Sequence, residues 1–139
     1  ALEPGATEEI AGYPVTTVPV AHTIDSSCFV VRGADATLGY SGDTGPTERL
    51  WKVLRAEKNL KALLMEVSFP NVEQKLATVS GHHTPRTLLK DLKKYGKPQD
   101  LPTLLYHIKP VFQAEVEREC AALKGVNLTV TALGDQFVL

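Results

Sequence analysis

The sequence predicts an α/β fold in which flanking helices pack on a mixed β-sheet, and three observations support this prediction. Segments with strand-like patterns alternate with segments in which apolar residues recur at helical spacing. Two segments, residues 60–67 and 103–108, are nearly continuous apolar runs, as in parallel strands that are covered on both faces by helices. Proline and glycine mark the ends of several helical segments. With 139 residues, the chain is long enough for one domain with its own core.

The N-terminal part of the chain is predicted to be mostly strand. It contains three segments that are rich in β-branched or aromatic residues and end near turn residues, namely residues 13–20, 28–32 and 36–41. Gly33 and Asp35 lie between the second and third segments and indicate a hairpin. The third segment ends on the turn Gly-Asp-Thr-Gly, residues 42–45, which leads into the first helix.

Four helices are predicted, at residues 46–58, 70–78, 84–96 and 110–125. Pro46 and Pro110 suit the first turn of a helix, and Thr84 is a typical cap before the first-turn Pro85. Gly96 ends the third helix as a left-handed stop, and a second glycine ends the fourth. Two closing strands are predicted at the C-terminus, at residues 126–131 and 136–139, joined by a Leu-Gly-Asp turn.

Composition narrows the classes of partner. The chain is 43% hydrophobic and 22% charged, with a formal net charge of −1. No global basic surface is expected, so a small-molecule substrate is favoured over a nucleic acid. No apolar run approaches the roughly 20 residues of a membrane span, which predicts a soluble protein without a membrane partner. The sequence does not specify whether its compartment is the cytoplasm or the periplasm. Cys28 and Cys120 belong to no metal-binding pair and are interpreted as small buried hydrophobes.

Four residues at or near strand ends are candidates for a functional site: His22, Asp43, His82 and His107. Taken singly, each has an ordinary explanation, since Gly-Asp-Thr is usually a turn or helix cap and a single histidine usually forms a structural hydrogen bond. Several such residues at successive strand-to-loop junctions are much less common. Because imidazole and carboxylate are the ligands of hydrolytic zinc sites, the set points to metal-assisted hydrolysis.

The motifs around these positions resemble a known family. In chain order they are Val-Pro-Val-Ala-His22-Thr, Ser-Gly-Asp43-Thr-Gly, Met-Glu66-Val-Ser-Phe-Pro-Asn, Ser-Gly-His82-His-Thr-Pro and Tyr-His107-Ile-Lys-Pro. Together they resemble the C-terminal half of a class II 3′,5′-cyclic-nucleotide phosphodiesterase of the metallo-β-lactamase superfamily. The Gly-Asp-Thr motif specifies only the superfamily, and the last three motifs indicate the subfamily. The resemblance runs from about residue 13 to residue 139. It implies that residues 1–139 are the C-terminal half of a metallo-β-lactamase-like αββα sandwich.

The resemblance also implies roles for individual residues. His22 would bind one zinc ion, Asp43 would bridge two, and His107 would bind the second. A carboxylate suits the bridging position because its two oxygens can serve two cations. The implied cofactor is therefore a pair of divalent metal ions, most simply zinc.

For the reaction, the resemblance implies that His82 faces the scissile phosphate and that Glu66 orients its ring. His83 is a second candidate for contact with the substrate, although the Gly-His register favours His82. Water activated between the metals would attack the cyclic phosphodiester. His82 would stabilise the phosphoryl group or protonate the departing 3′ oxygen, and the product would be a nucleoside 5′-monophosphate.

One family motif, His-x-His-x-Asp-His, is absent from the sequence, which contains only four histidines. The implied ligands supply two protein groups to each metal, whereas catalytic zinc usually has three. The expected explanation is an N-terminal half, on a preceding segment or a separate chain, that carries the remaining ligands and the second sheet. Without that half the sheet is expected to expose an apolar face, so the chain is expected to associate with a partner half or with itself.

Two alternatives remain open. The first is an endonuclease of the same superfamily that processes the 3′ ends of transfer RNA, against which the missing basic face argues. The second is a non-catalytic interaction half-domain whose ligand residues have no catalytic role.

Overall fold

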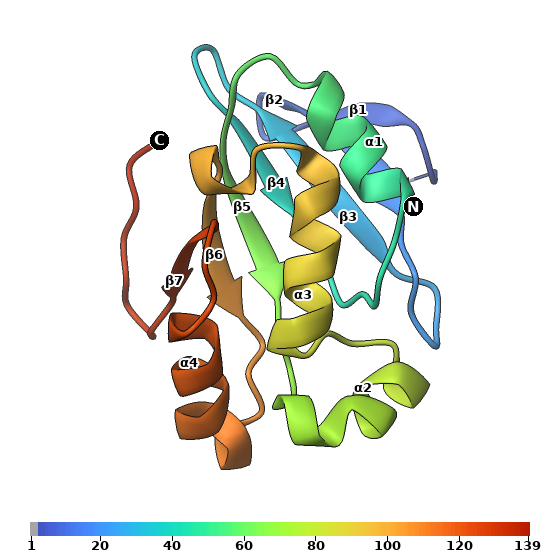
Figure 1. Ribbon diagram of the computed structural model, residues 1–139. Helices are drawn as coiled ribbons and strands as arrows, with labels where there is room; N and C mark the ends of the chain where they lie inside the picture. Colours follow the sequence, from blue (N-terminus) through green and yellow to red (C-terminus); the bar gives the residue numbers. More distant parts are fainter. Residues whose placement is uncertain (1–2) are drawn as a thin grey trace.

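One mixed sheet of seven strands forms the centre of the computed structural model, which describes residues 3–139 (Figure 1). The strands, in chain order, are β1 Thr7–Ile10, β2 Tyr13–Pro19, β3 Ser27–Arg32, β4 Thr37–Tyr40, β5 Leu60–Glu66, β6 Pro102–Tyr106 and β7 Asn127–Val130. Their order in the sheet is the same as their order in the chain. β1 to β4 pair antiparallel, whereas β4 to β7 pair parallel and need helical crossovers between them.

Helices cover one face of this sheet. They are α1 Arg49–Ala56, α2 Gln74–Ser80, α3 Pro85–Leu92 and α4 Gln113–Ala121, with short 3₁₀ turns at Asn71–Glu73, Lys93–Tyr95, Pro98–Asp100 and Pro110–Phe112. Figure 1 shows α1, α3 and α4 in front of the sheet and α2 beyond the end of β5. The core lies between these layers, where Leu63 and Met65 of β5 pack with Trp51, Leu88 and Val116 of the helices.

A buried polar contact joins two of the helices inside this core. Trp51 Nε1 donates a hydrogen bond of 2.7 Å to Asp91 Oδ2, and both side chains are almost fully buried. Lys94 Nζ lies 2.6 Å from the other oxygen of Asp91. The carboxylate therefore enters the core with partners on both oxygens, as a buried charge must.

Most predicted elements are confirmed with small differences in their ends. The helix predicted from residue 46 begins only at Arg49, and the Thr47 N–H that precedes it donates to Asp91 Oδ2. β1 was not predicted. The mixed sheet with flanking helices is confirmed. The expectation that the strand at residues 60–67 is covered by helices on both faces is wrong within residues 3–139, and so is the prediction of a closing strand at residues 136–139.

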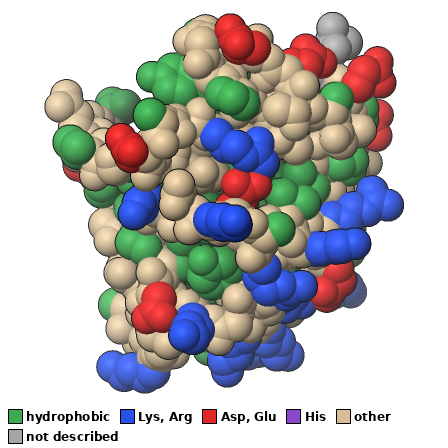
Figure 2. All heavy atoms as spheres, turned by 90° about the horizontal axis from the view of Figure 1, so that it is seen from above, with side chains coloured by type: hydrophobic (Ala, Val, Ile, Leu, Met, Phe, Trp, Pro, Cys, Tyr) green, Lys and Arg blue, Asp and Glu red, His purple; other side chains and the backbone are tan. Residues whose placement is uncertain are grey.

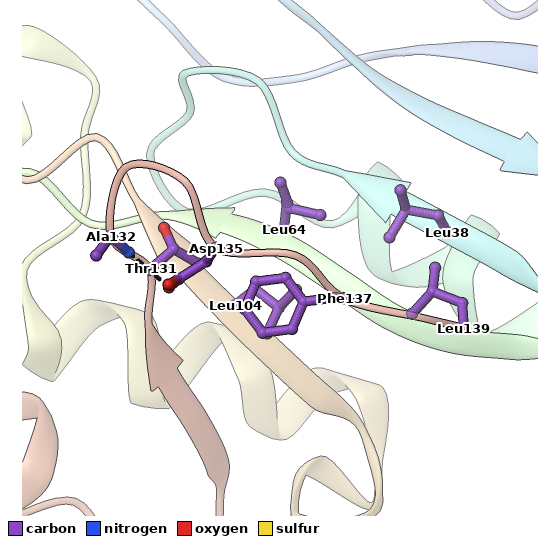
Figure 3. A pocket seen from close by; sticks show the side chains of 8 residues that line it. All are labelled: Leu38, Leu64, Leu104, Thr131, Ala132, Asp135, Phe137 and Leu139. Carbon is purple, nitrogen blue, oxygen red and sulfur yellow. Dashed lines mark hydrogen bonds between the residues drawn. The ribbon is translucent and has the colours of Figure 1, made fainter.

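Instead, the C-terminal segment crosses the helix-free face of the sheet. Asp135 Oδ2 accepts a hydrogen bond from the Ala132 N–H, and the chain then turns back along β5 and β6 (Figure 3). The tail places Phe137 and Leu139 beside three leucines of the sheet, at a shallow hollow of about 360 Å³ lined by Leu38, Leu64 and Leu104. Phe137 and Leu139 remain about half exposed. The apolar face expected from the sequence is therefore present, with a partial cover.

The end of the molecule opposite the carboxyl ends of β5 and β6 shows no histidine. Viewed from this end, Lys and Arg side chains are scattered among acidic and apolar ones (Figure 2). Among residues 3–139, no helix has the length and apolarity that crossing a membrane requires.

Candidate metal centre

The carboxyl ends of three neighbouring strands bring the candidate residues together. Because β4, β5 and β6 are parallel, the loops that follow them begin at the same edge of the sheet. Asp43 follows β4, Glu66 ends β5, and His107 follows β6 directly. His22 reaches this edge from the loop between β2 and β3, and His82 reaches it from the turn between α2 and α3. All five side chains therefore meet at one end of the molecule.

The backbone of the turn after α2 fixes the ring of His22. Its Nδ1 lies 3.0 Å from the carbonyl oxygen of Gly81. A carbonyl oxygen can only accept, so Nδ1 carries the proton and Nε2 keeps its lone pair. Gly81 has a φ of 72°, and a Cβ atom there would lie 2.9 Å from His22 Nδ1. This position therefore requires glycine, both for its backbone conformation and for the close approach of the ring.

Asp43 is held through its backbone, which leaves its carboxylate available. Ser26 Oγ donates a hydrogen bond of 2.8 Å to the Asp43 carbonyl oxygen. Two residues further on, the Gly45 N–H donates to the Ala21 carbonyl oxygen at 2.7 Å. These bonds tie the Gly-Asp-Thr-Gly turn to the loop that carries the first histidine. The Gly-Asp-Thr-Gly motif is usually only a turn, but here it also sets the distance between the candidate ligands Asp43 and His22.

His107 has a strained backbone. Its φ of 66° lies in the left-handed region, where a non-glycine residue costs on the order of 1–3 kcal/mol. Its Nδ1 lies 3.0 Å from Ser68 Oγ and 3.4 Å from Asp43 Oδ1, and its Nε2 lies 3.3 Å from Lys109 Nζ. Strain of this kind clusters at functional sites, and here it directs the imidazole back into the cluster.

Glu66 is fully buried and remains a carboxylate near neutral pH. Its Oε1 accepts a hydrogen bond of 2.7 Å from the His83 N–H, and its Oε2 accepts one of 2.8 Å from Ser68 Oγ. Oε2 also lies 3.3 Å from Nδ1 of His82. Burial alone would raise the pKa of Glu66, but hydrogen bonds from His107, His82 and Ser68 hold it below its ordinary value of 4.5.

The side chain of His83 lies outside this cluster. It is fully buried, with Nδ1 3.2 Å from Thr87 Oγ1 and Nε2 3.6 Å from Asp91 Oδ2. Burial lowers the pKa of His83 by more than the carboxylates of Glu66 and Asp91 raise it, so the ring is neutral at pH 7. The structure brings His82 to the other candidates and turns His83 into the protein. A contact between His83 and substrate would require the ring to leave this position.

Two overlapping groups of side chains have the composition of a metal site. One is His22, Asp43 and His82, and the other is Glu66, His82 and His107; within each group the ligand atoms lie within 4.8 Å of one another. Each offers three imidazole or carboxylate donors, which is the number of protein ligands in a catalytic zinc site with an open position. The residues therefore fit a divalent metal ion. The sequence assigned His82 only to the substrate, whereas the structure places it in both groups.

Two contacts of the site were missed in the sequence. Ser68 Oγ lies among Glu66, His82 and His107, and Lys109 Nζ faces His107. For Ser68 a signal was present, because it follows Glu66 by two residues, and alternate residues of an extended segment point to the same side.

Comparison with known proteins gives one relative in sequence and several in structure. No family model matches the chain. It is 36% identical to a protein of Yersinia pestis named "Probable 3′,5′-cyclic-nucleotide phosphodiesterase", over 63% of this chain and 31% of that protein. The chain therefore spans about a third of this relative.

Solved structures show the fold. The metallo-β-lactamase fold protein YhfI of Bacillus subtilis superposes with a TM-score of 0.73 at 15% identity, over 93% of this chain and 51% of YhfI. The short form of human tRNase Z gives a TM-score of 0.63 at 17% identity, over 89% of this chain and 42% of that one. Zn(2+)-bound PqqB of Methylobacterium extorquens gives a TM-score of 0.57 at 19% identity, over 93% of this chain and 48% of PqqB. Each match covers nearly all of this chain and about half of the other.

Proposed function

Because the chain has the metallo-β-lactamase fold over about half the length of its structural neighbours, we propose that residues 1–139 are the C-terminal half of a phosphodiesterase that hydrolyses 3′,5′-cyclic nucleotides. The observation that carries this proposal is the convergence of His22, Asp43, His82 and His107 around buried Glu66. The name of the Yersinia pestis relative supports the substrate class. The products would be nucleoside 5′-monophosphates.

In this proposal two divalent metal ions, zinc being the simplest choice, are held by His22, Asp43 and His107 together with ligands from an N-terminal half. A bound metal ion of this kind lowers the pKa of water and offsets the charge of a phosphate. Asp43 would be the ligand shared by the two ions, because its carboxylate lies near both His107 and His22. The remaining chemistry belongs to side chains of this chain.

His82 is the proposed general acid of the reaction. Glu66 Oε2, 3.3 Å from Nδ1, stabilises the ring when Nε2 holds a proton, and Nε2 then passes that proton to the departing 3′ oxygen. Only 7% of His82 is exposed, so the ring has few orientations available and bulk water has little access to it. Proton transfer of this kind typically contributes a factor of about 10²–10⁴ in rate.

The helix-free face of the sheet is the proposed contact for the N-terminal half. Leu38 and Leu64 are partly exposed there, and Phe29, Tyr40 and Tyr106 form a row of rings with centroids 6.3 Å and 5.2 Å apart. A second sheet packed on this row would complete the αββα sandwich, since two apolar sheet faces bury each other. In its absence, self-association through the same face is the expected substitute.

The test combines metal analysis with hydrolysis assays. The chain is assayed alone and mixed with the N-terminal half of the Yersinia pestis relative, in the presence of zinc, with cyclic AMP, cyclic GMP and a generic phosphodiester. The mixture should release 5′-monophosphate, and the variant His82→Ala should lose at least about 100-fold in rate. Cleavage of precursor transfer RNA without hydrolysis of cyclic nucleotides would favour the endonuclease. A chain that binds neither metal nor the second half would favour the non-catalytic module.

A further inference from the structure

Ser68 lies at the centre of the cluster, with one hydroxyl near three site residues. Its Oγ is 2.8 Å from Glu66 Oε2, 3.0 Å from His107 Nδ1 and 3.3 Å from His82 Nδ1. The residue is fully buried, so water does not compete for these bonds. A single oxygen atom therefore links the proposed acid, its carboxylate and a proposed metal ligand.

The hydrogen-bonding capacity of a hydroxyl decides how these contacts are made. A serine hydroxyl has one proton to donate and two lone pairs that accept. The Glu66 carboxylate has no proton to give, so the hydroxyl proton goes to Glu66. His107 must then donate to Oγ from Nδ1. Nδ1 of His82 lies 3.3 Å from both Oγ and Glu66 Oε2, and neither of these has a proton left to give it, so Nδ1 is the donor here too. Each ring is left with its lone pair on Nε2.

A contact at the other nitrogen of the His107 ring indicates the same tautomer. Lys109 Nζ lies 3.3 Å from His107 Nε2. An ammonium group has only donors, so Nε2 must accept and the proton of the neutral ring must sit on Nδ1. His22 has the same form, because its Nδ1 donates to a backbone carbonyl oxygen. Three imidazoles from three different loops thus share one tautomer.

We propose that Ser68 is a positioning residue that, together with Glu66 and Lys109, keeps the proton of each neutral ring of His82 and His107 on Nδ1. Nε2 of His107 is then free to bind metal, and Nε2 of His82 is the nitrogen that faces the substrate and takes up the proton to be transferred. The catalytic meaning of Ser68 rests on the proposed function, whereas the tautomers are a property of this chain alone. A neutral imidazole in water exchanges between two tautomers, and only one of them can ligate a metal through Nε2.

The test is nuclear magnetic resonance of the 139-residue chain, labelled with ¹⁵N at histidine, without metal and at about pH 8. His82 and His107 should show a protonated Nδ1 and a lone-pair chemical shift at Nε2. Ser68→Ala should raise the fraction of the other tautomer at both rings, because each loses one acceptor at Nδ1 while Glu66 and Lys109 keep their contacts. Ser68→Thr should retain the wild-type pattern because the hydroxyl remains. Ser41→Ala is the matched control: Ser41 is equally buried and its Oγ accepts from the Glu66 N–H, yet it contacts no imidazole.

Zinc titration of the same samples gives a second readout. Loss of an outer hydrogen bond to a ligand typically weakens metal binding by about 10–100-fold, and Ser68→Ala should fall in that range relative to Ser68→Thr. Protonated Nε2 in the wild-type chain, or unchanged tautomers in Ser68→Ala, would overturn the proposal. If Ser68→Ala fails to fold, the wild-type and Ser68→Thr spectra still decide it. Correct tautomers in a chain that never supports hydrolysis would count against the proposed function alone.

Discussion

The backbone of His107 shows how a single residue is held in place for its side chain. A left-handed conformation is unfavourable for every residue with a Cβ atom, and glycine adopts it without cost. Yet a histidine occupies this position at the end of β6, and its ring contacts Asp43, Ser68 and Lys109. The contacts of the imidazole therefore accompany, and offset, an unfavourable backbone conformation.

This strain predicts an unusual order of stability among variants. At most positions glycine is less stable than alanine, but His107→Gly should be more stable than His107→Ala by about 1 kcal/mol. Chemical denaturation of the two variants measures the difference, and both should bind zinc more weakly than the wild type. Equal stability of the two variants, or a more stable alanine variant, would show that the backbone is not strained in solution.

His83 predicts a pH dependence of stability. Its pKa is lowered in the folded chain by burial, so below its ordinary pKa of 6.5 the unfolded chain binds a proton that the folded chain does not. The free energy of unfolding should therefore be constant above about pH 7 and fall as the pH drops from 6.5, by at most about 1.4 kcal/mol per unit for this group.

The variant His83→Gln should flatten this slope, as measured by urea denaturation between pH 7 and pH 5. The groups that face the ring are Glu66, Asp91, Lys94 and His82. The contribution of Glu66, whose folded pKa is lowered, is lost only at more acidic pH, below its ordinary value of 4.5. The two effects therefore fall in separate windows. If the free energy of unfolding changed with pH equally in the wild type and in His83→Gln, His83 would not be the group responsible.

Among the secondary-structure elements, α1 and α3 are joined by the hydrogen bond between Trp51 and Asp91. Trp51→Phe removes one donor from a buried carboxylate, which typically costs about 1–3 kcal/mol in stability. A double-mutant cycle with Asp91→Asn separates this bond from the lost ring volume, and the coupling energy should be at least about 0.5 kcal/mol. Additive effects of the two substitutions would show that the contact contributes nothing.

At this scale the sequence was most informative where a pattern is local. The apolar spacing of Leu50 and Leu54, and the cap Thr84 before Pro85, each belong to a single helix, and those helices formed. The convergence of Asp43 and His107 also followed from their places after β4 and β6. For His82 the expected strand end is wrong, because it lies in the turn between α2 and α3.

What the sequence could not show depends on partners that are distant along the chain. The Thr47 N–H before α1 is bound by Asp91 of α3, and the ring of His83 lies inward against the same residue, so neither contact could be read from its own segment. Ser68 is a common residue type, and its role emerges only when two loops bring histidines to it. The tail lies over the leucines of the helix-free face instead of pairing with a strand, and its own four residues do not reveal this.

For the whole molecule, the tail and the helix-free face predict the state of association. Deleting residues 136–139 uncovers Leu38, Leu64 and Leu104, so self-association and binding of an apolar dye should both increase. Sedimentation velocity over a concentration series measures the self-association, and fluorescence measures the binding of the dye. Leu133→Ser is the matched control, because Leu133 is fully exposed. A deletion variant with unchanged sedimentation would argue against this face as a contact surface.

The agreement between strand order and chain order has a kinetic consequence. Each new strand pairs with the strand that was made just before it. The antiparallel hairpins close short loops, whereas the parallel pairs close longer helical crossovers, at an entropy cost that grows only slowly with loop length. Such a sheet can grow strand by strand as the polypeptide leaves the ribosome. Residues 136–139, which lie over the helix-free face, are made after all seven strands. The face that is proposed to receive the other half therefore stays open until those residues have been made.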